Sequence, residues 1–469
     1  MTFAADPIVP DSGHTAWLLV SSALVLLMTP GLAFFYGGLN RSKSVLNMMM
    51  MSFSAIGLIS ILWLMYGFSA AFGADKALSG STAGIIGDPG QYGGWKTFAT
   101  ELGYPFNPTL PIPTYVVLAF QMMFAIITVA LISGAISDRT KFLGWLVFAA
   151  GWFTLAYVPI AHMVWGGGFL GVTVGELDFA GGSAVHINAG SAALALAIVL
   201  GRRVGWPRES FRPHNVPFVA LGAGLLWFGW FGFNAGSELT ADGTAAVAFV
   251  NTQVATAGAL MGWIIIEWLR SGKPTLVGAS SGAVAGLVAI TPACAYIVPW
   301  AAALLGLVAG AVCALAVSLK YKLGFDDSLD VVGVHFVGGW IGCLWIGFFA
   351  TYQSGFATNL MPHEGLLYGG GWHQLVSQLE GAAVVTVWSF VVALGVGYGV
   401  KYTIGLRAKQ DAEIDGIDVA EHAESAYDFH STSGGGGGGA FALAGIGHGG
   451  AHAAEPKSAE SKPAQPANV

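Results

Sequence analysis

Two histidines lie inside apolar segments of helical length, and an aspartate precedes each of them by a few residues. His186 follows Asp178, and His335 follows Asp330. An imidazole in hydrocarbon is unfavourable unless it is hydrogen-bonded, so an ionisable side chain at membrane depth indicates an ion or proton route with a nearby partner. A packed core histidine is the alternative for either residue alone. Because the two histidines have matching surroundings, we expect each to be the other's partner.

The composition is that of a membrane protein. Of the 469 residues, 55% are hydrophobic and only 10% are charged, which excludes an ordinary soluble domain. Cys294, Cys313 and Cys343 all lie in apolar segments without metal-ligand spacing, so we expect them to be small core residues. The sequence contains no HExxH or clustered Cys-His motif. We therefore expect no metal, no cofactor, no enzymatic activity and no nucleic-acid partner.

Eleven apolar runs are long enough to cross a bilayer as helices. They cover residues 16–38, 45–72, 112–136, 142–162, 183–201, 216–235, 246–269, 276–292, 297–319, 331–352 and 375–404. Nearly all basic loop residues fall on one side of this arrangement, which the positive-inside rule assigns to the cytoplasm. They are Arg41, Lys43, Arg139, Lys141, Arg202, Arg203, Arg208, Arg212, Arg270, Lys273, Lys320, Lys322, Lys401, Arg407 and Lys409. We expect a multi-pass protein of the plasma (inner) membrane, with the N-terminus outside and the C-terminus inside.

An odd number of spans suggests an internal repeat, because eleven equals five plus five plus one. A five-helix unit inserted twice must be inverted in the membrane, and such repeats place equivalent elements at the midplane, where transport sites form. The fifth run carries His186 and the tenth carries His335. The predicted fold class is therefore an all-α polytopic membrane protein with 11 transmembrane helices, an inverted five-helix repeat and one extra helix.

Several motifs, in order along the chain, resemble those of the ammonium transporter (Amt/Mep/Rh) family, in its bacterial Amt-type form. They are PGLAFFYGGL (30–39), AHMVWGGG (161–168), DFAGGSAVHINAG (178–190), WFGFNAGS (230–237), GASSGAVAGLVAITPAC (278–294) and DVVGVHFVGGWIG (330–342). The resemblance covers residues 16–428. It implies transport of ammonium, with ammonia conducted through a hydrophobic pore, and a role in nitrogen uptake.

The resemblance assigns an entrance and a gate. Trp165, Phe124 and Ser237 match an outer vestibule that binds ammonium, where an indole face and a hydroxyl acceptor suit a small cation with N–H donors. Taken alone, Trp165 is equally well explained as an interfacial aromatic residue. Phe124 and Phe233 match a stacked pair that closes the pore, and an apolar closure passes a neutral molecule far more readily than an ion.

The resemblance also assigns a proton relay. His186 and His335 match twin pore histidines, and two neutral imidazoles can share one proton while staying hydrogen-bonded. A relay of this kind would move net charge. Asp178 fits a helix cap, and the resemblance adds a role at the entrance or in deprotonation. We favour the structural and electrostatic role for Asp178, and we interpret Asp330 as the matching cap of the tenth helix.

The chain after the last span divides into two parts. Residues 405–430 resemble a cytoplasmic regulatory tail, with its motif at Gly416, Asp418, His422, Glu424 and Tyr427, and Ala423 stands where glycine is common. This resemblance implies that the protein is a homotrimer and that a PII-class signal protein controls its transport. Residues 431–469 are rich in Gly, Ala and Pro, so we expect a disordered terminus after the transmembrane ammonium-channel domain, residues 1–404, and the tail.

Two other transport-related functions remain open at this point. A neutral gas channel of the Rh subgroup is disfavoured by Trp165 and Ser237, because that subgroup generally lacks this aromatic and hydroxyl entrance. An ammonium sensor would signal through the cytoplasmic tail, but the chain has no recognisable output domain. The leading hypothesis is a trimeric transporter that binds ammonium outside, deprotonates it and conducts ammonia past the histidine pair.

Overall fold

The computed structural model describes residues 9–75, 84–355 and 361–427, and within them the regular secondary structure is helical, with three isolated β-bridges in the loops. Ten described stretches are long and apolar enough to cross a membrane. They are Ser12–Leu39, Val45–Phe72, Thr114–Ile136, Phe142–Val174, Gly182–Leu200, Val216–Gly236, Gly243–Ser271, Pro299–Leu323, Val332–Phe349 and His373–Thr403. A shorter apolar helix, Leu276–Ile290, completes the set of eleven predicted runs. The predicted all-α polytopic class is confirmed. The last three residues of the predicted tail, 428–430, and the predicted disordered terminus, 431–469, lie outside the described residues.

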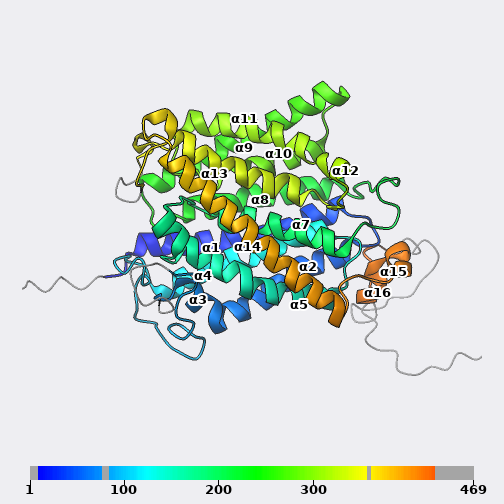
Figure 1. The fold of residues 1–469 in the computed structure, drawn as a ribbon, viewed down its shortest axis with the longest axis horizontal. Helices are drawn as coiled ribbons and strands as arrows, with labels where there is room; N and C mark the ends of the chain where they lie inside the picture. The colour runs from blue at the N-terminus through cyan, green and yellow to red at the C-terminus, as the bar shows by residue number, and fades with distance from the viewer. Residues whose placement is uncertain (1–8, 76–83, 356–360, 428–469) are drawn as a thin grey trace, which may run out of the picture.

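The first half of the described chain forms the helices from α1 to α7 (Figure 1). Their bounds are α1 Ser12–Leu39, α2 Val45–Leu62, η1 Trp63–Gly67, α3 Phe68–Phe72, α4 Thr114–Ile132, η2 Ser133–Ile136, α5 Phe142–Trp152, η3 Phe153–Tyr157, α6 Val158–Trp165, η4 Leu170–Val174, η5 Gly182–Ile187 and α7 Asn188–Leu200. The π-helical turns η1 and η3 continue into α3 and α6, so the chain crosses in single bent helices there.

The second half supplies the remaining helices and the tail. Their bounds are α8 Val216–Gly236, α9 Gly243–Ser271, α10 Leu276–Ile290, α11 Pro299–Ala316, α12 Leu319–Leu323, η6 Val332–Phe336, α13 Val337–Phe349, η7 Tyr352–Ser354, η8 Leu366–Tyr368, α14 His373–Thr403, α15 Gln410–Asp415 and α16 Ile417–His422. The described chain begins at one end of the bundle, and α15 and α16 lie at the other end (Figure 1).

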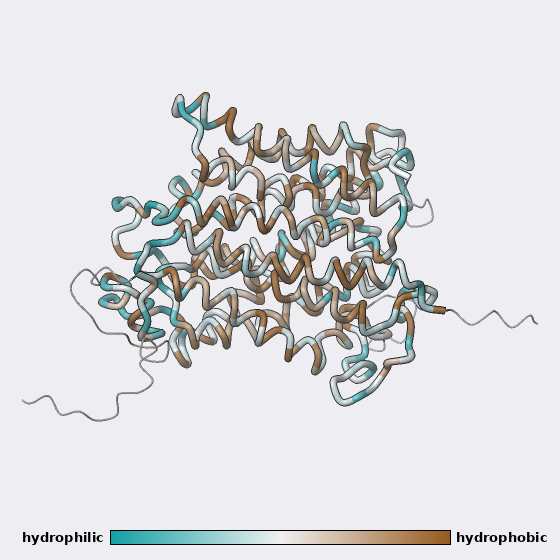
Figure 2. Tube along the Cα trace, turned by 180° about the vertical axis from the view of Figure 1, so that it is seen from behind, coloured by the Kyte–Doolittle hydropathy of each residue, from teal (hydrophilic) through white to brown (hydrophobic). Residues whose placement is uncertain are grey.

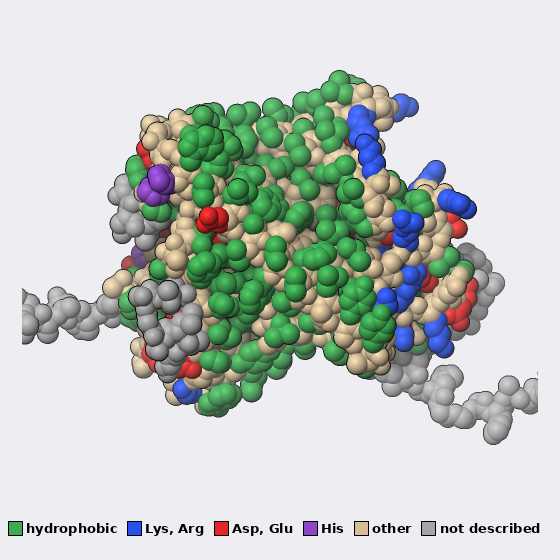
Figure 3. All heavy atoms as spheres, in the orientation of Figure 1, with side chains coloured by type: hydrophobic (Ala, Val, Ile, Leu, Met, Phe, Trp, Pro, Cys, Tyr) green, Lys and Arg blue, Asp and Glu red, His purple; other side chains and the backbone are tan. Residues whose placement is uncertain are grey.

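The surface polarity follows the length of the bundle. Apolar segments occupy its middle and hydrophilic segments lie mainly at its two ends (Figure 2). Figure 3 shows apolar side chains over the flank and most visible Lys and Arg side chains at the end that carries the tail. This distribution suits a bilayer, with an apolar band facing lipid between two polar ends.

Glycine allows the first and eighth helices to pack closely. A Cβ atom at Gly222 of α8 would collide with the backbone of Phe35 and with the carbonyl oxygen of Gly31, both in α1. In lipid, helix association depends on such close backbone contact, because burying apolar surface gains little there. The glycine content therefore serves packing of the bundle.

The short helix α10 ends inside the protein and leaves a turn next to the histidine segment. Its 15 residues extend about 22 Å, less than the roughly 30 Å of a bilayer core. The following turn is fixed by Asn251, whose side-chain amide donates to the carbonyl oxygens of Cys294 and Ile297 at 2.7 Å each. Pro292 of this turn packs against Gly182, where a Cβ would collide with the proline ring. The turn thus positions the start of η5.

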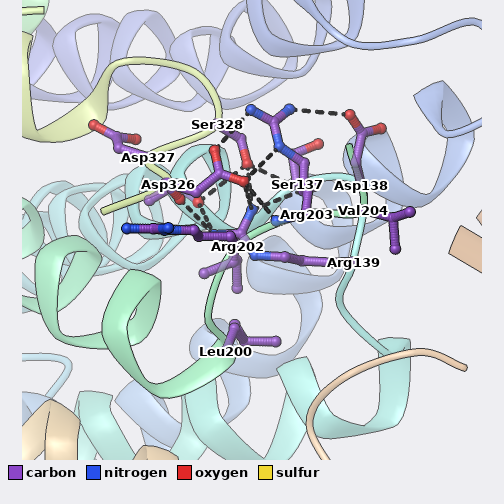
Figure 4. A network of polar contacts seen from close by, with 12 residues as sticks. Ser137, Asp138, Arg139, Leu200, Arg202, Arg203, Val204, Asp326, Asp327 and Ser328 are labelled. Atoms are coloured by element: carbon purple, nitrogen blue, oxygen red, sulfur yellow. Dashed lines mark hydrogen bonds and ion pairs between the residues drawn. The ribbon is translucent and has the colours of Figure 1, made fainter. Parts of the chain in front are cut away.

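Buried charges join three loops at the basic end of the bundle (Figure 4). Asp326 accepts hydrogen bonds from the Arg203 backbone N–H at 2.8 Å and from Arg203 Nε and Nη2 at 2.9 Å each. Arg203 also pairs with Asp138, and the fully buried Arg139 donates to Ser328 at 2.6 Å. Burial lowers the pKa of Arg139 to about 10 although Asp326 opposes the shift, so this guanidinium stays charged at neutral pH. The network holds the basic loops in one arrangement.

Candidate functional site

A vestibule of about 710 Å³ opens at the end of the bundle opposite the tail and contains the predicted entrance residues. Its walls include Phe124, Trp165, Ser237 and Asp178. Trp165 is the last residue of α6, and its indole Nε1 donates a hydrogen bond to the carbonyl oxygen of Asp178 at 2.9 Å. The Ser237 hydroxyl donates to the carbonyl oxygen of Phe233 at 2.8 Å, which leaves its oxygen free to accept from a bound N–H group.

Two phenylalanines stack beneath the vestibule. The rings of Phe124 in α4 and Phe233 in α8 lie 4.1 Å apart between centroids, with 23° between their planes. Phe124 also meets Trp165 edge to face at 6.0 Å, so one residue belongs both to the vestibule and to the closure. Both phenylalanines are buried, which makes the closure dry.

The two histidines meet directly beyond the phenylalanine pair. His186 Nδ1 lies 3.3 Å from His335 Nδ1, and the ring centroids are 5.4 Å apart. One ring must therefore donate and the other accept. His186 stacks on Trp230 at 5.5 Å, and the Trp230 indole N–H is held by Thr291 at 2.9 Å. The predicted pairing of the histidines is present in the structure.

The cavity around the histidines is narrow and apolar. Its volume is about 10 Å³, near the minimum that holds one water-sized molecule. It is lined by Met28, Leu32, Phe35, Ile127, Leu131, Val185, His186, Leu226, Trp230, Phe233, Val284 and His335. The buried Nε2 atom of His186 has no hydrogen-bond partner among the described residues, so it is available to a guest molecule.

Two further cavities continue the path toward the basic end. The first has a volume of about 40 Å³, and Phe35 and His335 line both it and the narrow cavity. The second has a volume of about 290 Å³. Leu39 and Asp330 line both of these cavities, and Arg203 of the basic loops also lines the larger one. Together with the vestibule, these spaces form a series that runs from one end of the bundle to the other past the histidine pair.

Asp178 makes the capping contacts expected of it. One carboxylate oxygen accepts from the backbone N–H groups of Gly181 and Gly182 at 2.8 and 2.6 Å. The other accepts from the N–H and hydroxyl of Ser183 at 2.9 and 2.8 Å and from the N–H of Ala184 at 3.0 Å. These bonds satisfy the first turn of η5 and place a negative charge at its positive end.

The interpretation of Asp330 as the matching cap is wrong, because Asp327 holds that position. Asp327 accepts from the N–H groups of Val331 and Val332 at 3.1 and 2.7 Å. Asp330 adopts a left-handed backbone conformation with φ of 64°, which turns its side chain away from the helix start. Its carboxylate instead pairs with Lys320 at 2.7 Å and lines the two inner cavities.

The two histidine segments have the same local design. His186 lies in the π-helical turn η5 and His335 in the π-helical turn η6, and each turn continues into an α-helix of 13 residues. A buried aspartate side chain caps the start of each segment. Such π-turns occur frequently at functional sites, and their recurrence supports the predicted repeat.

The tail docks on the start of α2. Asp418 accepts from the backbone N–H groups of Leu46 and Asn47 at 3.0 and 2.8 Å. His422 Nε2 lies 2.9 Å from the side-chain oxygen of Asn47. A carboxylate at a helix N-terminus is stabilised by unpaired N–H groups and by the helix dipole. The motif residues Asp418 and His422 therefore bind one helix end.

The other tail residues separate into structural and exposed positions. Gly416 has φ of 140°, a conformation that suits glycine, and Tyr427 makes a 2.8 Å hydrogen bond to His214. Glu424 is exposed. Ala423 has φ of 53°, which explains why glycine suits this position.

Sequence reasoning missed two carboxylates in the vestibule wall, Glu176 and Glu238. Burial raises the pKa of Glu176 to about 8, and Asp178 adds to the shift. Burial also raises the pKa of Glu238 to about 8, with a contribution from neighbouring Asp242. Glu176 follows residues 142–175, which contain no Asp, Glu, Lys or Arg, and this isolation in the sequence was the signal that could have identified it.

This geometry defines a membrane transport protein whose route narrows to the size of one small molecule. Comparison with known proteins assigns its family. Residues 16–427 match the Ammonium Transporter Family. The chain is 54% identical over 448 residues to an ammonium transporter of Mycobacterium tuberculosis, covering 91% of this chain and 92% of that protein.

Solved structures agree. Candida albicans Mep2 has 33% identity and a TM-score of 0.77, with 86% of this chain and 87% of that chain covered. A structure described as a sensor Amt protein has 29% identity and a TM-score of 0.77, with 87% of this chain and 98% of that chain covered. The chain belongs to the ammonium transporter family, and transport of ammonium across a membrane is its function.

Proposed function

We propose that the protein binds ammonium in the vestibule, deprotonates it there, and conducts ammonia through the apolar passage, with the proton following by the histidine pair. The observation that carries this proposal is the 3.3 Å contact between His186 and His335 inside a cavity of about 10 Å³, directly behind stacked phenylalanines. A space of this size accepts a single neutral molecule with little cost, whereas a cation would lose its hydration there.

Binding in the vestibule rests on Trp165, Phe124 and Ser237. The indole face attracts a small cation by roughly 1 to 2 kcal/mol where water is partly excluded. The Ser237 oxygen offers an acceptor to one ammonium N–H group. This entrance favours a charged substrate and argues against a neutral gas channel as the main function.

Charge movement rests on the histidine contact. One imidazole N–H donates to the other ring, and the outer Nε2 atom of His186 is free of partners among the described residues. A proton received at one ring can leave from the other, because both nitrogens of each ring exchange donor and acceptor roles. We propose that transport is electrogenic for this reason.

The test is an ammonium pulse applied to purified protein in liposomes, with transient current and internal pH recorded together. A saturating current in the native protein that disappears in His186→Ala supports the relay. His363→Ala is the matched control, because that histidine is exposed and lies outside the cavity walls. Internal alkalinisation without current would instead mean that ammonia moves alone.

Orientation and assembly belong to the same proposal. The basic end of the bundle faces the cytoplasm of a plasma (inner) membrane, which places the N-terminus outside and the tail inside. The unit is a homotrimer whose tail, residues 405–430, responds to a PII-class signal protein at the cytoplasmic exit. Labelling of a cysteine added at exposed Glu424 in right-side-out and inverted vesicles tests the orientation, and mass measurement in detergent tests the trimer.

A sensor is the second candidate function. It is favoured by the similarity to a structure described as a sensor Amt protein and by the docking of the tail on α2 through Asp418. Ammonium-dependent protection of the tail from proteolysis, in a variant that transports nothing, would support signalling. Transport without any change in the tail supports the transporter alone.

A further inference from the structure

Asp178 and Glu176 are two buried carboxylates in the vestibule wall. Asp178 is fully hydrogen-bonded, whereas Glu176 has no hydrogen-bond partner among the described residues. Asp178 accepts five hydrogen bonds from the start of η5. A carboxylate offers about four lone-pair sites, so Asp178 has none left for another donor. Asp178 is therefore a poor acceptor for a proton from ammonium.

Glu176 has no such partners. Its side chain is buried, with the residue only 4% exposed, and neither carboxylate oxygen has a hydrogen-bond partner among the described residues. An unpaired buried carboxylate costs free energy, so its retention requires either a proton or a cation beside it. Because Glu176 lines the vestibule where ammonium enters, the cation and its proton can both come from the substrate.

Two glutamines of α14 fix the loop that carries Glu176 by hydrogen-bonding the backbone on either side of it. Gln378 receives the Leu177 N–H at 2.7 Å and donates to the Leu177 carbonyl oxygen at 2.8 Å. Gln374 donates to the carbonyl oxygen of Gly175 at 3.1 Å. A Cβ at Gly381 would collide with the Glu176 carboxyl group, so glycine there leaves room for it. The position of Glu176 is built by its neighbours.

Few ionisable groups face Glu176. Asp178 lies on its own loop, and the Cys343 thiol of α13 is within electrostatic reach. The groups of α14 that fix the loop are neutral glutamines, and the hydroxyl of Ser183 in η5 donates to Asp178. Burial and the negative charge of Asp178 together raise the pKa of Glu176 to about 8, close to the working pH where a general base is most effective.

We propose that Glu176 is the group that takes the proton from ammonium in the vestibule, a step that rests on the proposed function. One N–H bond of ammonium breaks, one O–H bond forms on the carboxylate, and neutral ammonia proceeds to the phenylalanine pair. The proton then leaves Glu176 for water or for the histidine path, which restores the carboxylate. Asp178 positions the start of η5 and acts on Glu176 through its charge.

Glu238 is the competing carboxylate in the same vestibule, and it differs in two respects. It is only half-buried, and its neighbour Asp242 is a carboxylate that accepts hydrogen bonds from Thr240 and from the first N–H groups of α9. Glu238→Gln provides a variant that removes a similar carboxylate from the same space.

The experiment compares the native protein, Glu176→Gln, Glu238→Gln and His186→Ala in liposomes, with ammonium as the probe, over a pH series below the pKa of ammonium itself. We expect the maximum current of the native protein to rise with pH as Glu176 ionises. In Glu176→Gln we expect a maximum current lower by at least about tenfold and no such rise. Glu238→Gln should keep the rise.

A second measurement reads the proton directly. Infrared titration should show a carboxylic acid C=O band that shifts in D₂O, disappears with a midpoint near pH 8, and is missing from Glu176→Gln. An unchanged pH profile in Glu176→Gln, or a band that is lost only in Glu238→Gln, would overturn the proposal. If the native protein carries no ammonium-dependent flux, the proposed function fails, and the infrared titration still decides the protonation of Glu176.

Discussion

Replacing Glu176 by glutamine is expected to stabilise the folded protein, with a gain that grows as the pH rises. Glutamine keeps the shape of the side chain but carries no charge. Both side chains place polar atoms in the same buried site, so the cost of burying those atoms largely cancels between them. What remains is the cost of holding a charged carboxylate away from water.

The sign follows from the raised pKa. The ordinary value is 4.5 and the folded value is about 8, so between these limits the folded protein holds a proton that the unfolded chain has released. Stability of the native protein therefore falls as the pH rises through this window, and the loss is complete above the folded pKa. A shift of this size corresponds to at most on the order of 4 to 5 kcal/mol.

The assay is unfolding in detergent by denaturant or heat, carried out at about pH 5.5 and about pH 8.5. The advantage of Glu176→Gln over the native protein should increase by about 3 kcal/mol between these conditions. Glu101→Gln is the control, since Glu101 is an exposed carboxylate outside the vestibule wall. An advantage that is the same at both pH values within about 1 kcal/mol would refute the reasoning.

Three other substitutions have defined outcomes. Asp326→Asn removes the partner of Arg203 and should cost about 3 to 5 kcal/mol in unfolding experiments, and a loss below about 1 kcal/mol would contradict the network. Ala423→Gly relieves a left-handed backbone and should strengthen tail docking by about 1 kcal/mol, measured as slower hydrogen exchange of α16; unchanged exchange would contradict the strain. Gly182→Ala should cost about 1 to 3 kcal/mol against Pro292, whereas Gly395→Ala, with nothing within 4 Å, should not destabilise; equal effects would contradict the close contact.

The spans could be predicted because lipid imposes simple rules. A run of about 20 apolar residues must form a helix in a bilayer, so each predicted run lies close to an observed helical stretch. The differences lie where the chain leaves the bilayer. The predicted run 142–162 reaches Val174 in the structure, because α6 continues to Trp165 and the turn η4 follows after residues 166–168.

The site was harder to predict than the spans. The histidines could be identified because a titratable side chain in an apolar run is conspicuous, and their matching surroundings predicted the contact that the structure contains. The choice between Asp327 and Asp330 could not be made from spacing, because it depends on the backbone conformation of Asp330. Motif resemblance also directed attention to Asp178 and away from Glu176, whose isolation becomes visible only when every hydrogen bond is assigned.

The order of groups along the path constrains where the proton can part from the substrate. Beyond Phe124 and Phe233 the walls are apolar until the histidines, so an ammonium ion crossing there would lose its water without a carboxylate to replace it. On the vestibule side of the histidines, the carboxylates of the described lining lie before the phenylalanine pair, and Glu176 is one of them. The proposed function therefore requires that deprotonation precedes passage, so that ammonia and its proton reach the histidines separately.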